Sequence, residues 1–160
     1  YITVFTGLIT AAESADEVAG VLAHEMAHAT KRHGLRQLVQ SLSLAVVIQA
    51  MLGDVTGMAA LGGGVEILIR QGYSRDLESE ADTEGLLMVQ AAGWNPEGLA
   101  TFFERLEASG EGTSVPVWFS SHPDPGGRAE SIREQMKTAV PAGLQPPEIN
   151  WDQVRAALRQ

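Results

Sequence analysis

The sequence predicts an α+β fold that is mostly helical, with one small sheet beside the helices. Apolar residues recur at helical spacing through most of the chain after residue 13. The opening residues, YITVFTGLI, instead alternate and are rich in Ile, Thr, Val and Phe, which favours a strand over residues 1–9. We expect this strand to form the edge of the sheet and to flank the helix that follows. No internal repeat or low-complexity tract interrupts the chain, so residues 1–160 are interpreted as a single domain.

Capping residues predict where the first helices begin and end. Ser14 and Glu17 form a capping box that begins the first helix, and Gly34 lies near its expected end. Residues 35–52 are predicted to form a second, apolar helix, and the glycine-rich segment 53–64 ends it. The sequence HEMAH therefore falls in the middle of the first helix.

The second half of the chain is predicted to be helical as well. A third helix is expected from about Ser74 to Gly93, and a fourth after Asn95. The fourth helix is expected to bury Leu99, Phe102, Phe103 and Leu106. A loop over residues 109–123 leads to another helix that begins at the following Asp-Pro. Residues 141–160 are interpreted as a proline-rich link and a short amphipathic helix.

Composition argues against several classes of protein. Acidic residues outnumber basic ones by 20 to 11, and the net charge of −9 argues against a nucleic-acid partner, which would demand clustered Lys and Arg. The chain has no cysteine, so a metal would have to be held by His, Asp or Glu. The longest apolar tract, residues 42–52, is too short to cross a bilayer. Nothing in the sequence specifies an oligomeric state.

The sequence HEMAH, residues 24–28, is a candidate metal site. His24 and His28 are four residues apart, which on a helix places both imidazoles on one face, about 6 Å apart and within reach of one zinc ion. Glu25 lies beside them, where its carboxylate can take a proton from water without being a ligand. A helix can also collect two histidines and a glutamate by chance, with the histidines satisfying hydrogen bonds in a core. A third ligand would separate the two interpretations.

Two places in the sequence could supply that ligand. His33 lies five residues beyond the motif, which turns it away from the metal face of the helix, so we interpret it as solvent-exposed or helix-capping. Glu78 and Asp82 are four residues apart on the third helix, so Glu78 can reach the metal while Asp82 accepts a hydrogen bond from a ligand histidine. An ordinary solvated acidic face has the same spacing. Glu80 and Glu84 fall on other faces and are expected to be exposed.

Four motifs together resemble a known enzyme family. HEMAH is followed by SRDLESEAD, then by AAGWNP and SSHPDPGGR. This combination resembles the gluzincin-type zinc metallopeptidase family of the CAAX prenyl protease, HtpX and BepA, and is closest to the soluble BepA-like branch. The resemblance extends from the start of the chain to Arg128 and implies a zincin-like metalloprotease domain with one zinc ion per chain. Because members usually have a further helix and strand upstream of Tyr1, we expect part of the domain to precede it.

The resemblance also implies roles for individual residues. The expected zinc ligands are His24, His28 and Glu78, with Asp82 behind a histidine and Glu25 as general base. His122 belongs to a His-Pro loop that lies over the active site in BepA-like proteins and can take the fourth zinc position, which would latch the resting enzyme. Alternatively, His122 stabilises the oxyanion of the reaction intermediate. Arg128 is expected to hold this loop or a substrate carbonyl.

The activity implied is that of a zinc metalloendopeptidase acting on unfolded or extended proteins. The strand over residues 1–9 would align such a substrate through backbone hydrogen bonds, with little sequence preference. Protein quality control is a plausible role for such an enzyme. The lack of cysteine and the resemblance favour the bacterial periplasm or cell envelope.

The alternative function is a non-catalytic, zinc-stabilised chaperone or adaptor for envelope proteins. In this interpretation the apolar residues 35–69 form a docking surface for clients or a peripheral membrane contact. The same residues can form an ordinary buried helical pair, which we favour. Glu25 distinguishes the two functions, because a scaffold needs metal ligands but has no chemical use for a base.

Overall fold

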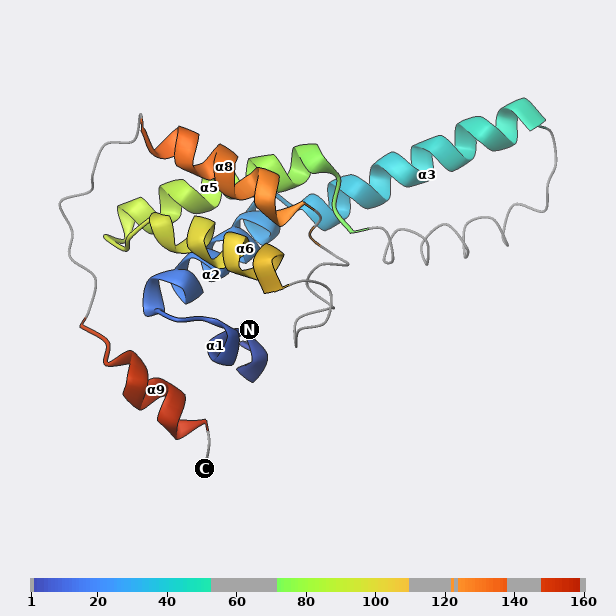
Figure 1. Ribbon diagram of the computed structural model, residues 1–160. Coiled ribbons are helices and arrows are strands. Elements are labelled where there is room, and N and C mark those ends of the chain that lie inside the picture. The colour runs from blue at the N-terminus through green and yellow to red at the C-terminus, as the bar shows by residue number, and fades with distance from the viewer. Residues whose placement is uncertain (1, 53–71, 110–121, 123, 138–147, 159–160) are drawn as a thin grey trace.

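In the computed structural model the protein consists of packed helices. The structure describes residues 2–52, 72–109, 122, 124–137 and 148–158, with the backbone alone for residues 44–52. These residues form α1 (Thr6–Ala11), α2 (Ala15–Thr30), α3 (His33–Leu52), α5 (Arg75–Ala91), α6 (Glu97–Ser109), α8 (Pro125–Met136) and α9 (Trp151–Ala157), as Figure 1 shows. The prediction of a mostly helical chain is confirmed. No helix within the described ranges is long and apolar enough to cross a membrane.

The start of the chain does not form the predicted strand. Residues 2–5 belong to no regular element, and α1 begins at Thr6, so the prediction is wrong from that residue onward. Ile2 and Phe5 are exposed. A strand is stable only when a neighbouring strand pairs with its backbone groups, and no described residue forms a strand beside this segment. The described parts of the chain contain no strand, so the expected sheet stays a prediction.

Most predicted helix boundaries are confirmed. Ser14, Ser74 and Asp124 cap α2, α5 and α8, and each side chain accepts a hydrogen bond from the backbone N–H three residues on. The short C-terminal helix is present as α9. The glycine-rich segment 53–64 and the proline-rich link at 141–147 lie outside the described residues.

The end of α2 differs from the prediction. The helix stops at Thr30, and Arg32 adopts a left-handed backbone with φ of 56°. The next helix, α3, begins directly afterwards at His33. The helix thus ends before the stop expected near Gly34, and the angular spacing of α2 does not extend to His33.

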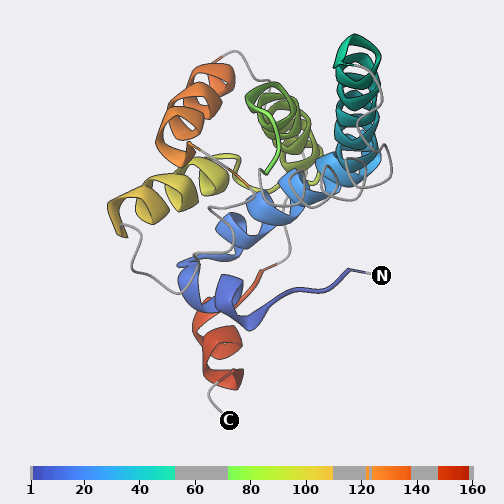
Figure 2. The same cartoon turned by 90° about the vertical axis from the view of Figure 1, so that its right-hand side faces the viewer.

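The helices α2, α5, α6 and α8 pack against one another (Figures 1 and 2). Their shared core includes Val21, Leu86, Leu99, Phe102, Phe103, Leu106 and Ile132. The four residues predicted to be buried on α6 are all among them. Burying large apolar side chains of this kind is the main favourable term in folding, and it holds α2 and α5 together.

Two glycines allow these helices to approach closely. A Cβ atom on Gly85 of α5 would lie 3.0 Å from the backbone nitrogen of His24, and one on Gly20 of α2 would lie 2.8 Å from Cβ of Leu99. Any larger residue would push the helices apart. The backbone of α5 therefore contacts α2 at the first histidine of the HEMAH motif.

The helix α3 extends away from the packed helices in both views (Figures 1 and 2). Leu35, Val39 and Leu42 are exposed on it. The interpretation of residues 35–69 as a buried helical pair is therefore wrong for these three positions. The side chains from residue 44 to residue 71 lie outside the described part of the chain.

Candidate metal centre

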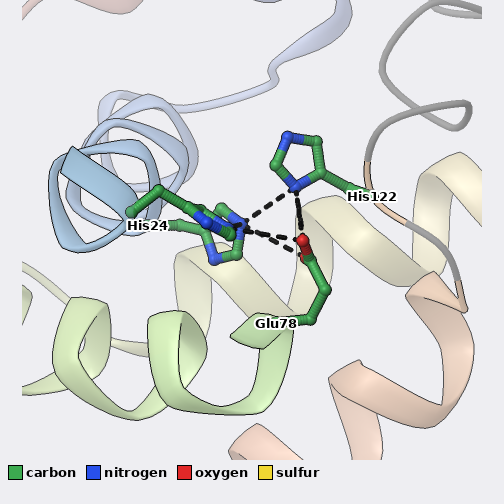
Figure 3. Close-up of side chains that lie close together, drawn as sticks. His24, Glu78 and His122 are labelled. Atoms are coloured by element: carbon green, nitrogen blue, oxygen red, sulfur yellow. Dashed lines mark hydrogen bonds and ion pairs between the residues drawn. The ribbon is translucent and has the colours of Figure 1, made fainter. Parts of the chain in front are cut away.

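Three segments of the chain bring four potential metal ligands together. His24 and His28 come from α2, Glu78 from the first turn of α5, and His122 from the segment before α8. One ligand atom from each lies within 4.8 Å of all the others. Figure 3 shows His24, Glu78 and His122 pointing toward one another.

Short distances join these four side chains. Nε2 of His24 lies 3.0 Å from Nε2 of His28 and 3.2 Å from Nδ1 of His122. Oε1 of Glu78 lies 3.4 Å from Nε2 of His28 and 3.1 Å from Nδ1 of His122. All four side chains are buried. Imidazole nitrogens and a carboxylate oxygen are the usual ligands of zinc in a cysteine-free site, so this donor set fits a metal ion.

Asp82 and Arg128 lie behind the cluster. Oδ1 of Asp82 is 3.0 Å from Nδ1 of His24, the ring nitrogen opposite the cluster. Arg128 donates to Asp82 through Nε at 2.8 Å and Nη2 at 2.6 Å. Its Nη1 lies 2.6 Å from Oε2 of Glu78. Burial would raise the pKa of Asp82, but the hydrogen bonds from Arg128 and His24 outweigh it and lower that pKa.

The described partners of Arg128 are carboxylates and an aromatic ring, and its expected role toward the loop or a substrate carbonyl stays a prediction. Its guanidinium is buried, pairs with two carboxylates and stacks 4.4 Å from the ring centroid of Phe103. This places it against the metal-ligand candidates Glu78 and His24. Arg128 therefore holds the carboxylates of Glu78 and Asp82 in place through ion pairs.

Glu25 lies at the exposed side of the cluster. Its side chain is 44 % exposed, and Oε1 lies 3.2 Å from Nε2 of His122. Burial opposes the charged form of both groups, but their mutual contact favours it. The contact lowers the pKa of Glu25, and together with Glu78 it raises the pKa of His122 to about 9.

The pKa values of Glu78 and His28 are also set by burial on one side and by contacts with neighbouring groups on the other. Burial would raise the pKa of Glu78, but hydrogen bonds with His122, His24 and His28 outweigh it and lower that pKa far below its usual range. For His28 burial is the largest cause, and it lowers the pKa of the imidazole. These shifts favour the carboxylate form of Glu78 and the neutral form of His28, which are the forms that bind a metal.

The structure contradicts the interpretation of His33 as exposed. Its side chain is buried, and Nδ1 lies 2.9 Å from Nδ1 of His28. The prediction assumed that α2 continues past Thr30, whereas the left-handed Arg32 turns the chain and directs His33 back toward the cluster. Burial and the nearby His28 lower the pKa of His33.

Sequence analysis also missed Tyr73. Its ring stacks on His28 with a centroid distance of 4.0 Å and an interplanar angle of 25°. Burial and the charges of Glu25 and Glu78 raise its pKa.

Glu80 and Glu84 were expected to be exposed. Both are half-buried instead, and both pair with Lys31.

Comparison with known proteins agrees with this geometry. The model of peptidase family M48 matches residues 1–136. The chain belongs to this family. The resemblance inferred from the sequence motifs is thereby confirmed, and membership of M48, a family of metallopeptidases, implies a metal ion.

Several M48 relatives are similar along most of this chain. The metalloprotease YcaL of Escherichia coli is 33 % identical over 141 residues, which cover 84 % of this chain and 54 % of the relative. The putative beta-barrel assembly-enhancing protease of Vibrio cholerae is 30 % identical over 172 residues, covering 99 % of this chain and 35 % of the relative. The mitochondrial metalloendopeptidase OMA1 of Arabidopsis thaliana is 37 % identical over 127 residues, covering 76 % and 25 %. The chain thus spans between a quarter and about half of the length of these relatives.

Proposed function

We propose that this protein is a zinc-dependent endopeptidase that hydrolyses peptide bonds in unfolded or extended proteins. The observation that carries the proposal is the convergence of His24, His28 and Glu78 with Glu25 beside them. These are two imidazoles, a buried carboxylate and a second carboxylate at the exposed side. Membership of the M48 family supports a metal-dependent reaction.

Each of these residues has a role in the proposed reaction. His24, His28 and Glu78 would hold zinc, which when bound polarises a carbonyl and lowers the pKa of water. Glu25 takes a proton from the attacking water and passes it to the leaving amine. Asp82 accepts the Nδ1 proton of His24, so that the Nε2 lone pair faces the cluster.

His122 acts as a latch in this proposal. Its Nε2 contacts Glu25, and its Nδ1 contacts Glu78. The imidazole thus occupies the space in front of the general base, where the attacking water and the substrate carbonyl must enter. Substrate binding therefore has to move His122, which fits an enzyme with low basal activity. The alternative role, stabilising the oxyanion, requires His122 to stay in place during the reaction.

Access to the cluster supports an extended substrate. The four candidate ligands are buried, whereas Glu25 is partly exposed, so a peptide bond has to approach from the side of Glu25. A compact protein cannot insert its backbone there, but a flexible segment can. The edge strand expected to align the substrate is not found among the described residues. The proposal of an extended substrate therefore rests on the exposed side of the cluster at Glu25.

We place the protein in the bacterial periplasm or cell envelope. Similarity to the beta-barrel assembly-enhancing proteases of Vibrio cholerae and Escherichia coli supports this location, because β-barrels of that kind belong to outer membranes. The absence of cysteine is consistent with it.

Substitution of Glu25 tests the proposal. Glu25→Gln keeps the shape of the side chain but removes the base, so it should retain zinc and fold while losing cleavage of casein. Zinc content and casein cleavage are measured on wild type, on this variant and on Glu130→Gln, which changes an exposed glutamate of α8. Cleavage by Glu25→Gln at the wild-type rate would exclude Glu25 as the base. A wild-type protein that holds zinc and cleaves nothing would favour the chaperone or adaptor instead.

A further inference from the structure

His33 is a buried histidine that the proposed reaction does not use. Its side chain is 0 % exposed, and it lies at the first position of α3, directly after the left-handed turn at Arg32. Nδ1 of His33 is 2.9 Å from Nδ1 of His28, a distance at which one nitrogen donates a hydrogen bond and the other accepts it. The two rings meet edge to face, with centroids 4.8 Å apart.

The direction of this hydrogen bond follows from the chemistry of His28. The nitrogen of His28 that faces His24 and Glu78 is Nε2. A neutral imidazole that offers the Nε2 lone pair to a metal carries its proton on Nδ1. Nδ1 of His28 is therefore the donor, and Nδ1 of His33 must accept. His33 then carries its own proton on Nε2.

Glu80 lies on the far side of His33. Nε2 of His33 is 3.4 Å from Oε2 of Glu80, a contact with a carboxylate that lacks the geometry of a hydrogen bond. Glu80 is itself held by Arg36, whose Nη1 donates to it at 2.6 Å. A proton on Nε2 of His33 is thus favoured over a proton on Nδ1, because only Nε2 faces a negative charge.

We propose that His33 is a positioning residue that fixes the tautomer and orientation of His28, with Glu80 anchoring His33. The arrangement parallels that at His24, where Asp82 accepts the Nδ1 proton directly. Two residues of one turn of α5 would then hold both histidines of the HEMAH motif, Asp82 directly and Glu80 through His33. The inference rests on the proposed metal centre.

Two substitutions of His33 test this proposal. His33→Leu fills the space but offers no acceptor to His28, so zinc affinity should fall about ten- to a hundredfold. His33→Asn places an amide oxygen near the position of Nδ1 and should recover most of that loss. Zinc affinity is measured by competition with a chelator, and the visible absorption spectrum of the cobalt-substituted protein reports the ligand geometry. Thermal unfolding of the metal-free proteins shows whether each variant folds.

A pair of glutamates on α5 gives a matched control. Glu80 and Glu84 are both half-buried and both pair with Lys31, but Glu80 also faces His33. Glu80→Ala should weaken zinc binding severalfold, and Glu84→Ala should leave it unchanged. Equal affinities in these two variants would overturn the anchoring role of Glu80, even if His33→Leu fails to fold.

The outcomes separate this inference from the proposed function. Wild-type zinc affinity and cobalt spectrum in His33→Leu would overturn the role of His33 while leaving the metal centre intact. A His33→Asn variant as weak as His33→Leu would assign His33 a structural role only. If wild type binds no zinc, or if His24→Ala binds it equally well, the metal centre fails and the inference fails with it.

Discussion

Asp82 and His24 meet across the contact between α5 and α2, with Oδ1 of the aspartate 3.0 Å from Nδ1 of the imidazole. Both side chains are almost completely buried, and Arg128 donates hydrogen bonds to both oxygens of Asp82. Because the carboxylate is held by the guanidinium, it can orient the histidine ring without moving. The pair therefore links the packing of two helices to the position of a candidate metal ligand.

Removing this carboxylate should weaken metal binding. Asp82→Ala leaves Nδ1 of His24 without its acceptor, so we expect zinc affinity or activity to fall about ten- to a hundredfold. Asp76→Ala, which changes an exposed aspartate in the first turn of the same helix, serves as control. Chelator competition gives the affinities. Equal zinc binding by Asp82→Ala and Asp76→Ala would contradict an orienting role for Asp82.

Substitution of Glu78 should have the larger effect. Glu78→Ala removes the carboxylate from the cluster, and two histidines leave zinc with too few protein ligands, so both metal binding and casein cleavage should be lost. Arg128 keeps its contacts with Asp82, which limits the effect on folding. Zinc content after dialysis is the measurement. Wild-type zinc content in Glu78→Ala would place the third ligand elsewhere.

The close approach of α5 to α2 makes a separate prediction. In Gly85→Ala the new methyl group would contact the backbone of His24, which we expect to destabilise the protein by about 1–3 kcal/mol and to weaken zinc binding. Gly7→Ala is the matched control, because its Cβ would meet no atom within 4 Å and α1 lies outside the metal centre. Alanine there should be neutral or stabilise by up to about 1 kcal/mol. Chemical denaturation measures both changes, and equal stabilities would exclude the steric argument.

Substitution of His122 separates the two roles considered for this residue. If His122 is a latch, His122→Ala opens the space in front of Glu25, and basal casein cleavage should rise while zinc stays bound. If it stabilises the oxyanion, the same variant should lose activity, about a hundredfold or more. The initial rate of the zinc-loaded variant distinguishes the two by its sign. An unchanged rate with unchanged zinc coordination would exclude both roles.

Much of the helical framework was predictable because its signals are local. A serine or aspartate that caps a helix acts within three residues, and this held at Ser14, Ser74 and Asp124. The strand predicted at the start of the chain failed because β-branched composition does not provide the partner that a strand needs. A helix formed from Thr6 instead.

For the candidate site, the sequence by itself determined that His24 and His28 share one face of a helix and that Glu78 and Asp82 share a face of another. In each pair the two residues are four apart on the same helix, which is enough to place them on one face. The tertiary structure alone decided that Arg128 pairs with two carboxylates, that Tyr73 stacks on His28 and that His33 is buried against it. These contacts join segments on either side of a turn or far apart in the chain. Their geometry depends on where α2 ends and how closely α5 packs, which no local spacing specifies.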